Sequence, residues 1–204
     1  KDKESWVCKI QELPTKNDSL TDIYQAIMIG LRDYVTKNNF PGVVIGMSGG
    51  VDSALSAIVA VDALGADRVH LVMMPSKFTS QESLIDAARA AEMLGCRIDN
   101  IPIGDGIDVF EKMLTASFAG VRKDLTEENL QSRLRAIILM GLSNKFGKMV
   151  LTTGNKSEMS VGYATIYGDM CGGFNALKDI YKLDVFQLSI WRNNNHPSGG
   201  FGPR

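Results

Sequence analysis

Cysteine and histidine, which build most disulfides and transition-metal sites, are scarce in this 204-residue sequence. The three cysteines, Cys8, Cys96 and Cys171, are odd in number, lie far apart and form no C-x-x-C pair. This spacing argues against a disulfide framework and against a cysteine-based zinc site. The two histidines, His70 and His196, are too few for a histidine metal cluster. We therefore expect a reduced, cytoplasmic protein.

Long apolar runs and an excess of either charge are also missing. No run approaches the ~18 residues of a membrane span, and the sequence shows no signal-peptide pattern. The 22 basic and 23 acidic residues leave a net charge of −1, so electrostatic attraction to nucleic acid or anionic lipid is not expected. Apolar residues make up 45% and charged residues 22%, as in ordinary globular proteins. Glycine is the outlier, with 20 residues, about 10% of the sequence against a usual share of ~7%.

The two ends of the sequence predict that it is part of a longer protein. It begins at Lys1 without an initiator methionine, and residues 197–204 are rich in proline and glycine. Residues 1–18 are polar and aperiodic, which predicts a tail or linker. We expect a single domain over residues 19–204, with its C-terminal part incomplete.

Strand-like apolar runs alternate with helical patterns along this domain. Residues 43–47 form a short apolar run typical of a strand buried on both faces. Further strands are expected at residues 68–74, 97–103 and 148–153. Helices are expected before the first strand, capped by Ser19 or Thr21, and between the strands, with Thr79 and Thr126 as caps. Spacings near the ~30 residues of a βαβ unit predict an α/β fold, a parallel twisted sheet with helices on both faces. Ligands of such Rossmann-like sheets bind at the carboxyl ends of the strands.

The loop that follows the first strand, Ser-Gly-Gly-Val-Asp-Ser at residues 48–53, turns sharply into a helix. Backbone N–H groups at a helix start, approached closely through glycines, form a cradle for phosphate. Asp52 would repel a phosphate unless a cation lies between them, and Mg²⁺ bound by Asp52 and phosphate oxygens would serve this purpose. The alternative is a tight turn in which Asp52 only favours the helix dipole.

Other readings of this loop remain open. The Walker A pattern is absent, because no lysine follows the glycines. Residues 46–50 match G-x-S-x-G, which would make Ser48 the nucleophile of a serine hydrolase with His196 as its base. A third possibility is a nucleotide-binding module without catalytic activity.

The motif S-G-G-x-D-S after a parallel strand resembles the P-loop of ATP pyrophosphatases, which share an adenine-nucleotide α-hydrolase-like fold. A second run follows the fourth strand and reads Thr-Gly-Asn-Lys-Ser-Glu at residues 153–158, continuing to Lys182. The two runs together resemble the NAD synthetase family over residues 18–204, specifically the synthetase domain of its glutamine-dependent kind. In those proteins a glutaminase domain precedes this one.

This resemblance implies a ligase that converts deamido-NAD to NAD in two steps. The nicotinate carboxylate attacks the α-phosphate of ATP and gives an adenylate and pyrophosphate. Ammonia, free or from a glutaminase domain outside this sequence, then displaces AMP. The implied co-substrate is ATP, the implied cofactor is Mg²⁺, and the family suggests at least a homodimer.

The resemblance also implies roles for individual residues. Asp52 and Glu158 match the Mg²⁺ ligands of the family and, with Lys182, form the catalytic set. The implied ATP contacts are Gly46, Met47, Ser48, Gly49, Gly50, Val51, Asp52, Ser53, Thr153 and Lys182. The implied deamido-NAD contacts are Asn129, Arg133, Glu158 and Asp169.

One departure from the family is visible, since Ile166 stands where ammonia-dependent members carry a substrate-binding lysine. That contact must come from another group. The matched residues also have plainer structural readings: Glu158 as an acid at a helix start, Arg133 paired with Asp124 or Glu127, and Lys182 as an exposed side chain.

Overall fold

The sheet consists of five parallel strands in the order β3-β2-β1-β4-β5, in a computed structural model that describes residues 18–204. The strands are β1 (Val43–Met47), β2 (Val69–Met73), β3 (Arg97–Asn100), β4 (Met149–Thr152) and β5 (Phe174–Asn175). The order of the chain reverses between β1 and β4, which is where ligands of such sheets bind. The predicted parallel α/β sheet is confirmed. The predicted tail lies outside the described residues except for Asp18.

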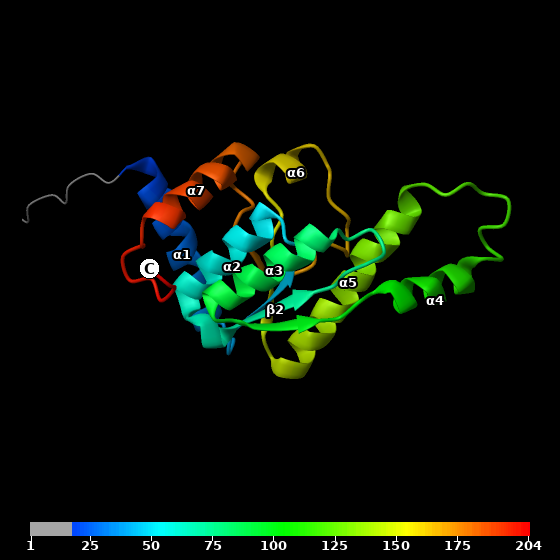
Figure 1. The fold of residues 1–204 in the computed structure, drawn as a ribbon, viewed down its shortest axis with the longest axis horizontal. Helices are drawn as coiled ribbons and strands as arrows, with labels where there is room; N and C mark the ends of the chain where they lie inside the picture. The colour runs from blue at the N-terminus through cyan, green and yellow to red at the C-terminus, as the bar shows by residue number, and fades with distance from the viewer. Residues whose placement is uncertain (1–17) are drawn as a thin grey trace, which may run out of the picture.

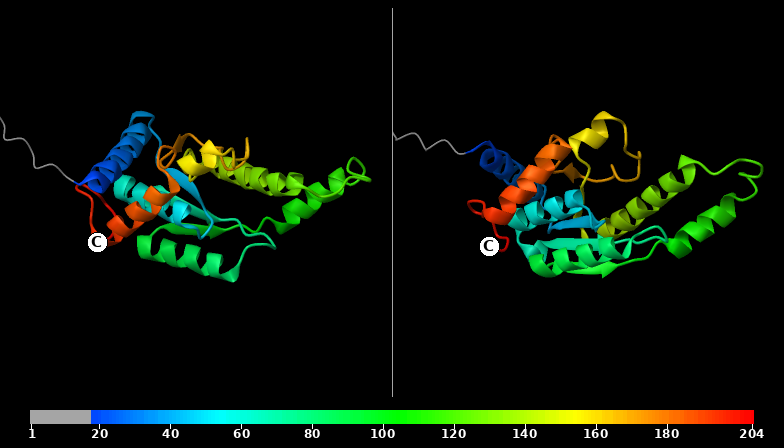
Figure 2. Two further views of the ribbon diagram at one scale, coloured as in Figure 1. Left: turned by 90° about the horizontal axis from the view of Figure 1, so that it is seen from above. Right: turned by 45° about the horizontal axis from the view of Figure 1, so that its top comes forward.

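Helices cover both faces of the sheet (Figures 1 and 2). The helices are α1 (Ser19–Lys37), α2 (Val51–Leu64), α3 (Gln81–Leu94), α4 (Gly104–Leu114), α5 (Leu125–Phe146), α6 (Lys156–Ser160) and α7 (Lys182–Asn194), with a 3-10 turn at Ala66–Arg68. Helices α1, α2, α3 and α7 contribute to one buried core, and α4 and α5 contribute to a second. Helix α4 and the first half of α5 project beyond the sheet as an arm (Figure 2).

The strand β1 shows why the sheet has two cores. Val43 and Ile45 are fully buried in the core beneath α1 and α2, whereas Val44 between them is buried against α4 and α5. Side chains alternate between the two faces of a strand, so a strand covered on both sides must be apolar at every position. The prediction from the continuous apolar run of residues 43–47 is therefore confirmed.

The structure corrects three predicted helix starts. In each case the residue directly before the helix, an Asp or a Ser, accepts a hydrogen bond from a backbone N–H of the first turn. The observed caps are Asp18 for α1 instead of Ser19 or Thr21, Ser80 for α3 instead of Thr79, and Asp124 for α5 instead of Thr126. Asp124 and Glu127 bond reciprocally in a capping box, so neither pairs with Arg133.

The sequence analysis did not predict two of the observed elements, and it predicted one strand that is longer than the observed one. It did not anticipate β5, a two-residue edge strand, or α7, which carries Lys182 at its first position. The third strand ends at Asn100 instead of residue 103 and is partly exposed at the sheet edge. Within residues 18–204, no helix is both long enough and apolar enough to cross a membrane.

Candidate functional site

The loop between β1 and α2 brings backbone N–H groups to the carboxyl edge of the sheet. Gly49 has φ of +83°, and a Cβ there would lie 2.3 Å from the carbonyl oxygen of Ser83, so only glycine fits. Gly50 precedes α2 as its N-cap, and no side chain caps this helix start. The first N–H groups of α2 are consequently available to an anion.

Two serines hold this loop closed. The Ser53 hydroxyl donates to the carbonyl of Gly50 at 2.9 Å, and its oxygen accepts from the backbone N–H of Ser48 at 3.3 Å. The Ser48 Oγ accepts from the N–H of Gly50 at 3.1 Å and lies 3.2 Å from the Ser53 Oγ. The sequence-predicted loop is thus a compact turn with two hydroxyls at the helix start.

The three predicted catalytic residues lie close together, two of them bonded to one buried amide. The side-chain NH₂ of Asn155 donates to Asp52 Oδ1 at 2.9 Å, and the backbone N–H of Asn155 donates to Glu158 Oε2 at 3.1 Å. Asp52 Oδ2 forms an ion pair with Lys182 Nζ. Asp52 lies in the first turn of α2, Glu158 in the first turn of α6, and Lys182 begins α7, so three helix starts converge here.

Two cavities open at this convergence. The first has a volume of about 590 Å³ and the second about 430 Å³. Ser48, Thr152, Thr153 and Asp169 line both of them. The predicted residues Asp52, Ser53 and Glu158 line only the first, and Gly46 and Met47 line only the second. The site can therefore hold two ligands that meet at the end of β4 and the loop after β1.

The two predicted residues of α5 contact a loop instead of lining a cavity. Asn129 Oδ1 accepts from the hydroxyl of Thr165 at 3.0 Å, and the Arg133 Nε–H donates to the carbonyl of Ile166 at 3.3 Å. The N–H of Thr165 donates to Asp169 Oδ1 at 2.7 Å. Asn129 and Arg133 thus hold the loop that carries Asp169 to the cavities. Gly49, Gly50, Val51 and Lys182 are likewise absent from the two linings.

Sequence reasoning missed Asn155 and Arg135. Asn155 is fully buried and caps α6 in a reciprocal box with Glu158, and the N-x-x-E spacing could have indicated it. Arg135 lines the 430 Å³ cavity, and its Nε–H donates to the carbonyl of Met74 at 3.2 Å. Burial lowers the pKa of this guanidinium. No local pattern distinguishes Arg135 from other arginines on the surface of a helix.

The hydrolase interpretation of Ser48 requires an imidazole, and the structure holds both histidines elsewhere. His70 Nε2 bonds to Asp99 Oδ2 at 2.8 Å, and His196 Nε2 bonds to the carbonyl of Gly202 at 3.0 Å. Among residues 18–204, neither imidazole hydrogen-bonds to Ser48. The serine therefore lacks the base that a nucleophile needs.

Mg²⁺ suits the oxygen ligands of this site. Asp52 and Glu158 present hard carboxylate oxygens on either side of Asn155, beside the open start of α2. Within residues 18–204, no group of three or more His, Cys, Asp and Glu side chains could hold a metal by itself. Two carboxylates completed by phosphate oxygens are a common arrangement for this ion.

Comparisons with known proteins identify the family that this chain matches. The family model described as NAD synthase matches residues 23–198. A glutamine-dependent NAD(+) synthetase of Rhodobacter capsulatus is 57% identical over 85% of this chain and 31% of its own length. The chain thus spans about a third of the length of the curated relatives it matches.

Solved structures show the same likeness. The glutamine-dependent NAD+ synthetase of Acinetobacter baumannii in complex with ADP has a TM-score of 0.89 and 50% identity, covering 93% of this chain and 36% of that one. The NH3-dependent NAD synthetase of Campylobacter jejuni has a TM-score of 0.79 and 30% identity, covering 87% and 75% of the two chains. With its matched sequence, its parallel sheet and its loop after β1, the chain belongs to the NAD synthase family.

Proposed function

We propose that residues 19–204 form the synthetase domain of a carbon–nitrogen ligase, which uses ATP to amidate deamido-NAD. The observation that supports this most strongly is that Asp52, Glu158 and Lys182 converge at one edge of the sheet. Asp52 and Glu158 line the 590 Å³ cavity, which shares Ser48 and Thr153 with the 430 Å³ cavity. The names of the relatives, NAD(+) synthetase, point to the same reaction. A reaction between two anionic nucleotides needs two adjoining pockets and positive charge where they meet.

Each cavity receives one nucleotide in this proposal. ATP occupies the 430 Å³ cavity, with its phosphates at the start of α2 and near Lys182, in keeping with the ADP complex named for the Acinetobacter relative. Deamido-NAD occupies the 590 Å³ cavity beside Glu158 and Asp169. Thr153, which lines both cavities, lies where the nicotinate carboxylate meets the α-phosphate.

The reaction begins when the carboxylate attacks the α-phosphorus, which breaks the bond to pyrophosphate and leaves an acyl adenylate. Ammonia then adds to the acyl carbon, loses a proton and expels AMP. Asp52 and Glu158 would hold Mg²⁺, which supplies charge neutralisation for the phosphates when it is bound. Lys182 stabilises the charge that develops on the departing pyrophosphate. The backbone N–H groups after Gly50 orient the phosphates.

We also propose a homodimer formed through the arm of α4 and α5. Val109, Met113, Val121 and Leu125 on and beside this arm are each at least 57% exposed, which is unusual for apolar side chains so close together in sequence. Sedimentation equilibrium of the chain measures its oligomeric state. The cytoplasmic location stays a prediction.

Pyrophosphate release tests the proposed function. The chain should release pyrophosphate only when Mg²⁺, ATP and deamido-NAD are all present, and form NAD when ammonium is added. Asp52→Asn and Glu158→Gln preserve side-chain size but remove charge, and each should slow release by about 100-fold or more, as expected for lost metal assistance. Exposed Asp86 on α3 offers a matched control, and Asp86→Asn should keep the full rate.

Four outcomes would contradict the proposal. Near-normal release by Asp52→Asn would remove this carboxylate from the metal site. Release without deamido-NAD would point to a simple ATPase. Labelling of Ser48 by a fluorophosphonate would favour the hydrolase. NAD formation with ammonia-free glutamine as the sole donor would show that this chain contains a glutaminase site.

A further inference from the structure

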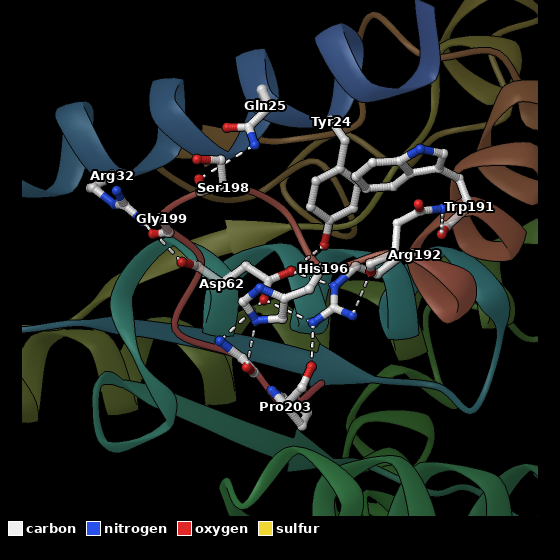
Figure 3. A network of polar contacts seen from close by, with 12 residues as sticks. Tyr24, Gln25, Arg32, Asp62, Trp191, Arg192, His196, Ser198, Gly199 and Pro203 are labelled. Atoms are coloured by element: carbon white, nitrogen blue, oxygen red, sulfur yellow. Dashed lines mark hydrogen bonds and ion pairs between the residues drawn. The ribbon is translucent and has the colours of Figure 1, made fainter. Parts of the chain in front are cut away.

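Helix α7 contacts α2 through two ion pairs, of which the proposed reaction uses only one. Lys182 meets Asp52 at the site, and Arg192 meets Asp62 farther along both helices. The second pair is bidentate, with Arg192 Nε donating to Asp62 Oδ2 at 2.8 Å and Nη2 donating to Oδ1 at 3.0 Å (Figure 3). On each helix the two charged residues are ten positions apart. The pairs are therefore separated by about 15 Å along parallel helices.

The second pair is sealed from solvent and fully hydrogen-bonded. The Asp62 side chain is 0% exposed and that of Arg192 is 9% exposed. Besides Arg192, the Tyr24 hydroxyl donates to Asp62 Oδ2 at 2.6 Å and the N–H of Gly202 donates to Oδ1 at 3.1 Å. Arg192 Nη2 also donates to the carbonyl of Pro203 at 2.7 Å, so the end of the chain closes over the pair (Figure 3). Although burial disfavours its charge, contact with Asp62 raises the pKa of Arg192.

Between the two pairs the facing positions are apolar. The spacings of three and four residues place each set on one helical stripe: Asp52, Leu55, Val59 and Asp62 on α2, and Lys182, Val185, Leu188 and Arg192 on α7. The four apolar members are buried in the same core. Apolar contact is non-directional and does not by itself define how far one helix slides along another. A buried bidentate guanidinium–carboxylate pair does define it, because its geometry is specific.

We propose that Asp62 and Arg192 are positioning residues for the ligase site. They set the register of α7 along α2, so that Lys182 reaches Asp52 and the phosphates of ATP. A slide by a single residue would displace Lys182 by about 1.5 Å. This inference rests on the proposed function, because the register of α7 matters to the reaction only through the position that it gives to Lys182.

Removal of one charge could unfold the chain, so the test removes the polar group as a unit. The triple variant Tyr24→Phe, Asp62→Leu, Arg192→Met replaces the pair and its phenol donor with apolar side chains of similar size. Such replacements of buried ion pairs are often neutral for stability. Thermal unfolding should show a folded, cooperative protein, while the dissociation constant of MgATP, measured by calorimetry, should rise about tenfold.

A double-mutant cycle separates an effect of helix register on Lys182 from a general loss of stability in the variant. Changes about 15 Å apart are normally additive, whereas coupled positions are not. Lys182→Met alone should weaken MgATP binding. Because the triple replacement acts through Lys182, adding it to Lys182→Met should raise the dissociation constant by less than a further twofold. Val69 is buried at the amino end of β2, away from the carboxyl ends of the strands where the site lies. Val69→Ala creates a cavity there, and should lower the melting temperature and leave MgATP affinity unchanged.

The outcomes distinguish this inference from the proposed function. If the unaltered chain does not bind MgATP, the proposed function fails and the inference fails with it. If the chain binds MgATP but the losses from the triple replacement and Lys182→Met are additive, the proposed function stands and the inference is wrong. Full affinity in the folded triple variant would also overturn it.

Discussion

The two ends of α2 present the same kind of interaction in opposite surroundings. At its start, Asp52 and Lys182 are 17% and 38% exposed and border the 590 Å³ cavity through Asp52. Near its end, Asp62 and Arg192 are buried beneath Tyr24 and the final residues of the chain. A pair open to solvent can exchange partners for a ligand, whereas a sealed pair cannot do so without leaving a buried charge. In the proposed function, one helix thus carries a ligand-binding end and a structural end.

The largest expected effect on stability is the difference between removing the carboxylate of the buried pair and removing that of the exposed pair. Asp62→Ala leaves Arg192 buried without its partner and should lower the free energy of unfolding by about 3–5 kcal/mol. Asp52→Ala removes a partly exposed pair and the acceptor of the buried Asn155 amide, and should cost less, about 1–3 kcal/mol. Urea unfolding of both variants measures the difference. Equal losses would show that the two ends do not differ as their burial indicates.

A second contrast uses the glycines that flank the same helix. Gly49 and Gly65 both have positive φ, but a Cβ would collide with Ser83 at Gly49 and would meet nothing within 4 Å at Gly65. Gly65→Ala should cost about 1–3 kcal/mol from backbone strain alone and leave MgATP binding intact. Gly49→Ala should cost more and weaken MgATP binding, because the loop must move. Unfolding and calorimetry on the matched pair test this, and intact binding by Gly49→Ala would contradict it.

The smallest expected effect concerns a third pair, away from both ends of α2. Burial lowers the pKa of His70 despite its bond to Asp99. As the pH falls from 7 to 5, the unfolded chain therefore takes up a proton at this position before the folded chain does. Stability should decline with acidification, by at most about 1.4 kcal/mol per pH unit for one proton.

Urea unfolding at pH 7, 6 and 5 measures this decline. His70→Gln cannot titrate and should flatten the profile, whereas the control His196→Gln should retain the decline. An unchanged slope in His70→Gln would assign the pH dependence to other groups.

The sequence determined the features that depend on neighbouring residues. The apolar run of residues 43–47, the glycine turn before Asp52 and the alternation of strands with helices are local patterns, and they predicted the parallel sheet and the edge at which the loop lies. The resemblance to the family predicted that Glu158 and Lys182 belong to the same site as Asp52. Helix starts were less predictable, because Ser, Thr and Asp compete within a few residues for the same N–H groups.

Only the tertiary structure decided which distant side chains meet. Asn155 bonds to Asp52 across 103 positions, and each pair between α2 and α7 spans 130 positions. Asn129 and Arg133 are four positions apart and share a helix face, and packing directs both of them to the loop that contains Thr165 and Ile166. Periodicity specifies which face of an element is apolar, but the register between two packed elements depends on contacts that no local pattern contains.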